Sequence, residues 1–165
     1  MSAMSAGVRA PDFTLPTLDG QKVSLQNLLD KGPVFLIFFK VGCPTCQYAM
    51  PFFERMYKAN RSENVSFLGI SQDKTKDTQA FVKQFGVTFP VALDDPSNYA
   101  VSNAYGLTNV PTLFYVGPSG EIEISSVSWL KNEVLAINAK LAEHRQQPAA
   151  ALWQKGEEVR DFRAG

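Results

Sequence analysis

The chain contains two cysteines, Cys43 and Cys46, which lie in the stretch FKVGCPTC directly after an apolar run. Two thiols at this spacing can form a disulfide with each other, supply half of a zinc site, or pack as small apolar side chains. One pair in 165 residues is too little for a structural disulfide framework. The chemistry therefore depends on where the pair lies in the fold.

The zinc interpretation lacks ligands. Structural zinc takes four soft or borderline ligands, and the one histidine, His144, lies far along the chain on a predicted surface helix. We therefore predict no metal and no other cofactor. Inert packing is disfavoured because the two cysteines lie at a predicted strand-to-helix junction rather than within a strand.

The junction favours a redox pair. A thiolate at Cys43 would lie at a helix N-terminus, where free backbone N–H groups and the helix dipole stabilise negative charge. Cys46, one turn further along, should be more buried, so Cys43 would attack a disulfide and Cys46 would resolve the mixed disulfide. Pro44 fits the first helical turn. Lys40 either adds positive charge here or is simply solvated.

The surrounding pattern predicts the elements that position this pair. Apolar residues 34–39 indicate a central strand, and the helix after Cys46 contains Pro51, which should kink it. A hairpin around Asp19-Gly20 precedes them. After them we expect strands at 65–71 and 89–93, helices at 75–86 and 97–106, a hairpin of 111–116 with 121–125, and a helix at 129–144. This order predicts an α/β fold with a mixed sheet.

Length and composition indicate one globular domain. We divide the chain into an N-terminal arm (1–9), a domain (10–145) and a polar tail (146–165). The tail either frays or docks through Trp153 and Phe162.

Charge and hydropathy limit the partners. Sixteen basic and sixteen acidic residues argue against a nucleic-acid binder, and no apolar run suits a membrane helix. The first residues show no apolar core of a signal peptide, which predicts a cytoplasmic protein, or a periplasmic one if the sequence is cut from a longer precursor.

A second signal is the dipeptide Val110-Pro111 at the head of a predicted strand. Proline is ordinary at a strand start, but it is also the residue that adopts cis peptide bonds.

Together these stretches resemble the thioredoxin superfamily, and within it the TlpA-like and AhpC/TSA redoxins. The resemblance rests on APDFTLPTLDGQKVSLQNL, VFLIFFKVGCPTCQYAMPFFERM, SFLGISQDKTKDTQAFVKQFGVTFPVALDD and AYGLTNVPTLFYVGPSGEI, and covers roughly residues 10–145. It implies a thioredoxin-like fold: a central mixed sheet flanked by helices, with an N-terminal hairpin extension and an insertion after the second core strand.

The resemblance also implies roles for single residues. Pro111 would be a cis-proline facing the cysteines, and the backbone at Val110 would pair with an extended substrate. Val41 and Gly42 would complete the substrate contact surface.

The sequence departs from the family pattern at three places. Gly42 replaces the usual aromatic residue, and Pro44-Thr45 replaces the usual Gly-Pro. The positions of the family's buried carboxylate, which helps to deprotonate the second cysteine, hold Ile37 and Ala49. The redox potential and the proton acceptor for Cys46 therefore stay open.

The predicted function is thiol-disulfide exchange with protein or small-molecule disulfides, supported by an electron donor that the sequence does not identify, in a monomer or weak dimer. A thiol peroxidase is the first alternative, with Cys43 peroxidatic and Cys46 resolving. Peroxiredoxins carry proline and threonine or serine where this chain has Leu36 and Lys40. The second alternative is a non-catalytic binding protein of the same fold.

Overall fold

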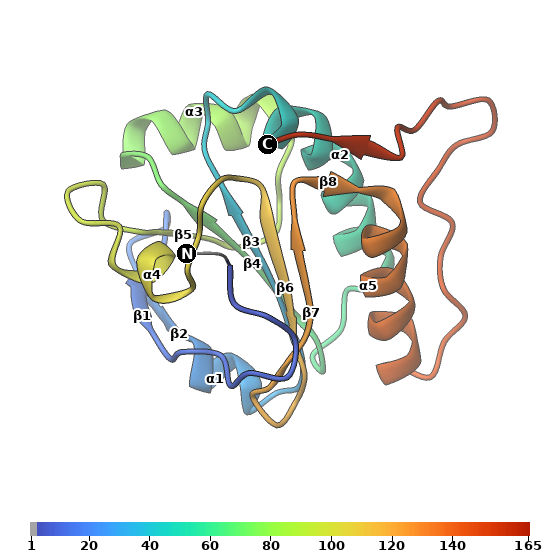
Figure 1. The fold of residues 1–165 in the computed structure, drawn as a ribbon, viewed down its shortest axis with the longest axis horizontal. Helices are drawn as coiled ribbons and strands as arrows, with labels where there is room; N and C mark the ends of the chain where they lie inside the picture. Colours follow the sequence, from blue (N-terminus) through green and yellow to red (C-terminus); the bar gives the residue numbers. More distant parts are fainter. Residues whose placement is uncertain (1–2) are drawn as a thin grey trace.

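The computed structural model describes residues 3–165, which form a five-stranded mixed sheet with helices on both faces (Figure 1). The strand order is β5-β4-β3-β6-β7. The strands are β3 (Val34–Phe39), β4 (Ser66–Ser71), β5 (Val91–Leu93), β6 (Thr112–Val116) and β7 (Ile122–Val127). β3, β4 and β5 run parallel, whereas β6 is antiparallel to both of its neighbours.

The central position of β3 follows from its composition. All six of its residues are buried, because helices cover both faces of the sheet at this strand. Phe35 pairs with Phe67 of β4 on one side and with Tyr115 of β6 on the other. The strand therefore ends, just before the cysteines, at a fixed place in the middle of the sheet.

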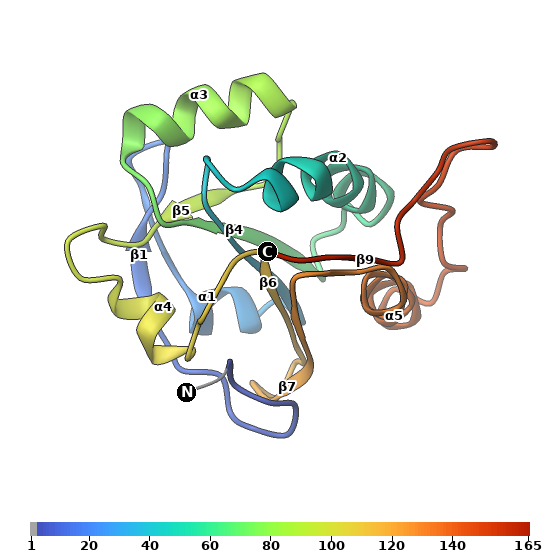
Figure 2. The same ribbon diagram turned by 45° about the horizontal axis from the view of Figure 1, so that its top comes forward.

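Aromatic side chains fill the two layers between sheet and helices. α2 (Pro44–Ala59) and α5 (Lys131–His144) cover one face, and α1 (Leu25–Leu29) and α4 (Ala100–Ala104) lie on the other (Figure 2). Phe35 meets Phe53 of α2 at a centroid distance of 5.8 Å, and Phe38 meets Tyr105, next to α4, at 5.3 Å. The alternation along β3 thus anchors the sheet to both helical layers.

The predicted N-terminal hairpin forms as β1 (Thr14–Pro16) and β2 (Lys22–Ser24), which pair antiparallel. Ser24 caps α1 by accepting the backbone N–H of Asn27 at 3.1 Å. Thr17 bridges to Ala92 of β5, so the hairpin continues toward that edge of the sheet.

The insertion after β4 contains α3 (Thr75–Phe85), which ends at Gly86 in the left-handed conformation. Beyond β5, buried Asp94 accepts the backbone N–H groups of Val101 and Ser102 at 3.2 and 2.7 Å. This carboxylate fixes the start of α4, and α4 leads directly to the loop that carries Pro111.

The last predicted helix begins two residues later than expected. Trp129 and Leu130 form β8 (Trp129–Leu130), which pairs antiparallel with β9 (Phe162–Arg163) near the end of the chain. Of the two tail residues expected to dock, Trp153 packs against Phe52 at 5.3 Å, whereas Phe162 stays 58% exposed. Part of the tail therefore packs against α2 and α5, and its last residues return along β8 to the start of α2.

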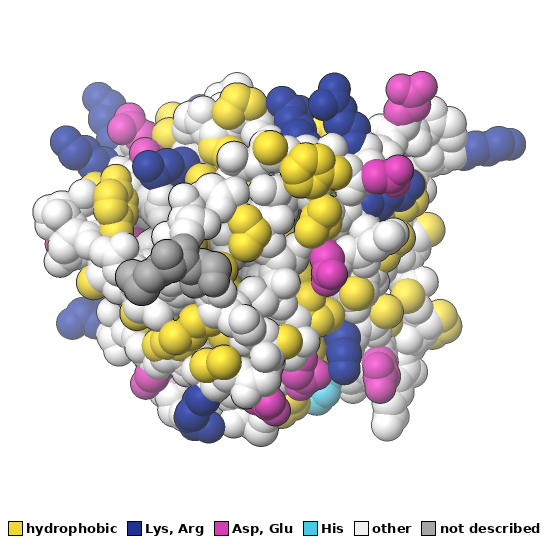
Figure 3. Space-filling view, in the orientation of Figure 1, with side chains coloured by type: hydrophobic (Ala, Val, Ile, Leu, Met, Phe, Trp, Pro, Cys, Tyr) yellow, Lys and Arg dark blue, Asp and Glu magenta, His cyan; other side chains and the backbone are white. Residues whose placement is uncertain are grey.

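None of the helices in residues 3–165 has both the length and the apolar composition needed to cross a membrane. On the face shown in Figure 3, acidic and basic side chains are interspersed, in keeping with the balanced charge.

Candidate active site

Cys43 lies at the N-terminus of α2, between the end of β3 and the first helical turn. It is the N-cap residue, and its sulfur accepts the backbone N–H of Cys46 at 3.1 Å. Pro44 occupies the first turn, where a missing N–H costs nothing. Cys43, the attacking residue predicted from the sequence, therefore caps α2 with its own sulfur.

This position makes Cys43 acidic. A hydrogen bond from the Cys46 thiol, backbone N–H groups of Cys46 and Thr45, and the charge of Arg163 lower the pKa of the Cys43 thiol from 9.0 to about 6. Partial burial of Cys43 opposes this effect without cancelling it. At neutral pH Cys43 is then mainly thiolate, the form that attacks disulfides.

Cys46 has the opposite character. Its side chain is fully buried, and burial raises its pKa far above the ordinary value, with the hydrogen bond to Cys43 acting in the same direction. Ile37 and Ala49, at the two positions of the family's carboxylate, are also fully buried. The pair therefore consists of one acidic, half-buried thiol and one protonated, buried thiol.

The loop before Cys43 is held by hydrogen bonds to the backbone of Val41. Its N–H donates to Oδ2 of Asp73 at 2.8 Å, and its carbonyl accepts from the side-chain amide of Gln47 at 2.8 Å. Val41 is half-buried and Gly42 is exposed beside the cysteines. Lys40 is exposed, and its ammonium lies over the ring of Tyr99 at 5.5 Å.

The loop before β6 faces the same thiol. The Val110–Pro111 peptide bond is cis, as predicted, and the carbonyl oxygen of Val110 lies 3.5 Å from the sulfur of Cys43. Both residues of this bond are buried. The structure thus brings together Cys43, Cys46, Val110 and Pro111, while Pro51 lies further along α2 and is exposed to solvent.

Sequence reasoning missed the residues that approach this site from the end of the chain. Thr45, between the two cysteines, is buried and donates its hydroxyl to the carbonyl of Ala164 at 2.5 Å. The positive charge that lowers the pKa of Cys43 belongs to Arg163, whose guanidinium lies over the ring of Tyr48 at 5.3 Å. The polar tail carries no periodic pattern that could have predicted either contact.

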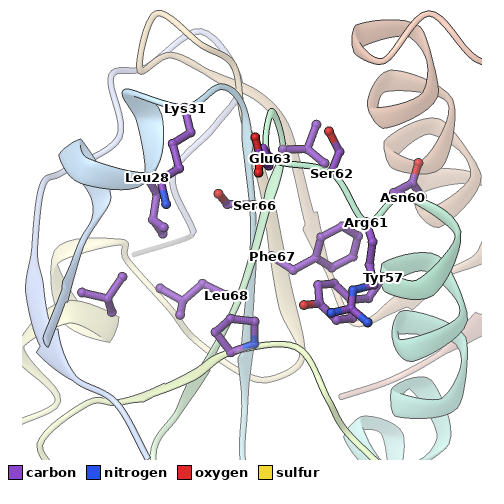
Figure 4. A pocket seen from close by; sticks show the side chains of 13 residues that line it. Leu28, Lys31, Tyr57, Asn60, Arg61, Ser62, Glu63, Ser66, Phe67 and Leu68 are labelled. Carbon is purple, nitrogen blue, oxygen red and sulfur yellow. The ribbon is translucent and has the colours of Figure 1, made fainter. Parts of the chain in front are cut away.

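Neither cysteine lines the hollow shown in Figure 4, which lies between α1, β4 and the end of α2. Its wall includes Leu28, Tyr57, Arg61, Glu63 and Phe67. Within residues 3–165, no group of three or more histidine, cysteine, aspartate or glutamate side chains is placed to hold a metal ion.

A mixed sheet with this strand order, a Cys-x-x-Cys pair capping the helix after its central strand and a cis-proline opposite define a thioredoxin-like dithiol redoxin. The family model described as "AhpC/TSA family" matches residues 6–125, so the chain belongs to that family.

Its relatives include thiol-disulfide oxidoreductases. The chain is 34% identical over 122 residues to the thiol-disulfide oxidoreductase ResA of Halalkalibacterium halodurans. The match covers 73% of this chain and 68% of that protein. Similarity at this level over most of both chains establishes that the protein is a thiol-disulfide oxidoreductase.

Solved structures of related proteins superpose on this chain. StoA from Bacillus subtilis superposes with a TM-score of 0.60 at 26% identity, covering 71% of this chain and 87% of that one. The thioredoxin domain of a thiol-disulfide oxidoreductase from Bacteroides vulgatus gives a TM-score of 0.74 at 21% identity, covering 84% and 98%. The second likeness supports the fold alone.

The predicted cytoplasmic location is wrong. Relatives of the ResA and StoA type are extracytoplasmic thiol-disulfide oxidoreductases, which conflicts with that assignment. The prediction rested on the first residues, which show no apolar core of a signal peptide, and on the lack of an apolar run long enough for a membrane helix. Both observations describe the redoxin domain, and such a domain can function on either side of a membrane.

Proposed function

We propose that Cys43 is the nucleophile of the exchange reaction and Cys46 the resolving thiol. The Cys43 thiolate attacks one sulfur of a substrate disulfide, which forms a mixed disulfide and releases the other substrate sulfur as a thiol after protonation. Cys46, once deprotonated, attacks the Cys43 sulfur and releases the second substrate thiol. The substrate gains two electrons and two protons, and the protein is left with a Cys43–Cys46 disulfide.

The observation that carries this assignment is the contrast between the two thiols. Cys43 is partly exposed, caps the helix and has a pKa of about 6. Cys46 is fully buried one turn away, with a raised pKa. A substrate disulfide can reach the first sulfur and not the second, so only one order of attack fits.

The backbone around Pro111 supports substrate binding in this scheme. The carbonyl of Val110 lies beside the sulfur of Cys43, so a substrate segment held against Val110 places its own sulfur in line with the thiolate. Val41 and Gly42 flank the other side of Cys43 and complete the contact surface. Residues 10–145 would form the redoxin domain that carries both halves of this surface.

The homologous oxidoreductases imply disulfide-bearing proteins as substrates. We extend this to small-molecule disulfides, because Cys43 is partly exposed and its reaction needs only access to the sulfur. Turnover then requires a dithiol donor to reduce the Cys43–Cys46 disulfide.

The protein would act as a monomer or weak dimer. Sedimentation of the reduced form tests this oligomeric state.

Trapping tests the order of attack. With insulin as substrate, Cys46→Ser should accumulate a mixed disulfide through Cys43, because the resolving thiol is absent, and Cys43→Ser should be inactive and form no adduct. Mass spectrometry of the adducts identifies the cysteine. Adducts through Cys46, or equal trapping by both variants, would contradict the assignment. Hydrogen peroxide consumption faster than insulin reduction would instead favour the peroxidase alternative.

A further inference from the structure

The last residues of the chain lie on the surface that the proposed substrate would use. We define the strap as residues 160–165, which include β9. In Figures 1 and 2 the strap runs from beside the start of α5 along β8 and finishes beside the start of α2 and of β6. Those two starts carry the cysteines and the cis-proline.

The closest contact is between Gly165 and the Val110–Pro111 bond. A Cβ atom added to Gly165 would overlap the carbonyl oxygen of Val110 and would lie 3.1 Å from Cδ of Pro111. The backbone of Gly165 therefore covers this peptide bond without room for a side chain. Next to it, the carbonyl of Ala164 accepts the hydroxyl of Thr45, between the two cysteines.

The strap is bound as an added strand. Trp129 pairs with Arg163, and Leu130 pairs with Phe162. The N–H of Gly165 donates to the Ser128 hydroxyl at 3.1 Å. This is the way in which an extended peptide binds to a sheet edge: backbone hydrogen bonds hold it in register, and it then crosses the cis-proline loop.

Two further hydrogen bonds hold the first strap residue. The indole N–H of Trp129 donates to the carbonyl of Arg160 at 2.7 Å, and the N–H of Arg160 donates to the Tyr48 hydroxyl at 3.0 Å.

Almost no apolar burial holds the strap in place. Phe162 is 58% exposed, and Asp161, Ala164 and Gly165 are exposed as well. Segments that are held mainly by hydrogen bonds, with little buried apolar surface, open at low free energy. The chain before the strap is attached more firmly, because Leu152 is 2% exposed and Arg55 pairs with Glu157 at 2.6 Å.

We propose that the strap occupies the substrate groove of the reduced protein as an internal peptide, and that a protein disulfide reaches Cys43 only after residues 160–165 have left. The anchored residues Leu152 to Glu157 keep the displaced strap attached, so it can return when the product leaves. This inference rests on the proposed function, since it assumes that substrate binds across Val110 and Pro111.

Hydrogen exchange on trapped adducts tests the displacement directly. Cys46→Ser is prepared with Cys43 joined to a short cysteine-containing peptide, and the matched control carries only a methylthio group on Cys43. With the peptide, the amides of Arg160, Lys131 and Gly165 should lose protection, because their acceptors lie in the strap or in its binding site. With the methylthio group they should remain protected.

Equal protection in the two adducts would overturn the inference while leaving Cys43 as the nucleophile. Failure to form any adduct at Cys43 would instead refute the proposed function, so the two failures are distinguishable.

Two variants test the consequence for rate. A chain ending at Val159 lacks only the strap. Gly165→Val keeps the hydrogen-bonding groups of the strap, but its side chain cannot fit against Val110. Ala151→Val also introduces a valine, at an exposed position upstream, and is the control. Well above the pKa of Cys43, both test variants should reduce insulin several-fold faster than the parent. Gly165→Val, which keeps Arg163, should reduce oxidised glutathione at the same rate as the parent. Unchanged or slower insulin reduction in both folded variants would overturn the inference.

Discussion

The sulfur of Cys43 lies 3.5 Å from the carbonyl oxygen of Val110. Cys43 follows the C-terminal end of β3, and Val110 precedes the N-terminal end of the neighbouring strand β6. The antiparallel pairing of these strands creates this proximity, because the end of β3 and the start of β6 meet at the same edge of the sheet. The nucleophile and the substrate-binding backbone are thus positioned by the most buried part of the fold, and not by the loops that carry them.

The first prediction concerns the pH dependence of alkylation. The rate at which iodoacetamide modifies Cys43 should rise with pH through a midpoint near 6 and then level off, because the lowered pKa makes the thiolate the major form above that value. Cys46 should stay unmodified over the same range, since burial raises its pKa. Peptide mapping by mass spectrometry separates the two sites. Earlier modification of Cys46 would contradict the assigned roles.

The second prediction concerns Arg163. Arg163→Ala should raise the apparent pKa of Cys43 slightly, because the charge of Arg163 is the smallest of the effects that lower this pKa and acts through screened solvent. Arg163→Lys should restore most of the effect, and Arg160→Ala is the control from the same strap. High salt should reduce the difference between parent and Arg163→Ala. A shift that is unaffected by salt would show that the arginine acts through packing and not through charge.

The third prediction concerns stability at the start of α4. Asp94→Ala should lower the free energy of unfolding by about 1–3 kcal/mol, because three backbone N–H groups lose a buried acceptor. Asp95→Ala removes an exposed carboxylate that accepts hydrogen bonds from the backbone and side chain of Ser97, and it should cost much less than Asp94→Ala. Urea unfolding measures both. Equal losses would mean that Asp94 does not fix the helix.

The fourth prediction concerns the anchor of the tail. Arg55 donates to both carboxylate oxygens of Glu157, at 2.6 and 2.9 Å, and lowers the pKa of that carboxyl to about 2. A lowered pKa means that the ion pair is intact above the ordinary value of 4.5 and weakens only as pH falls toward 2.

At neutral pH, Glu157→Gln should therefore expose the tail to trypsin at Lys155, while Glu158→Gln, one residue along and exposed, should not. The measurement is the rate of cleavage of the folded protein. Indistinguishable rates for the two variants would rule out the ion pair as the anchor.

Local sequence patterns were sufficient to predict most of the fold and the centre of the site. The apolar run of β3, the spacing along α2 and the glycine that ends α3 each act within a few residues, so they can be recognised without knowledge of the rest of the chain. The position of the cysteines follows from the first two of these patterns, because the pair lies where β3 gives way to α2. The same holds for Val110-Pro111, which opens a strand with a strong apolar pattern.

The pairing of β8 with β9 could not be predicted in this way. Each strand has two residues, too few for an alternating pattern, and about thirty residues of irregular chain and helix separate them. The contacts of Thr45 with Ala164 and of Arg163 with Tyr48 depend on this pairing. They therefore became visible only when the tail was placed in three dimensions.

The position of the tail also gives the protein a built-in optical probe. Both tryptophans of the chain lie in one aromatic cluster, Trp129 with Trp153 at 6.3 Å and both with Phe52 at 5.2 and 5.3 Å. The indole N–H of Trp129 is bonded to the carbonyl of Arg160, so movement of that residue changes the polarity that the ring experiences. Intrinsic fluorescence of the unlabelled protein is thus a signal from the border of the redox site, available in real time during turnover.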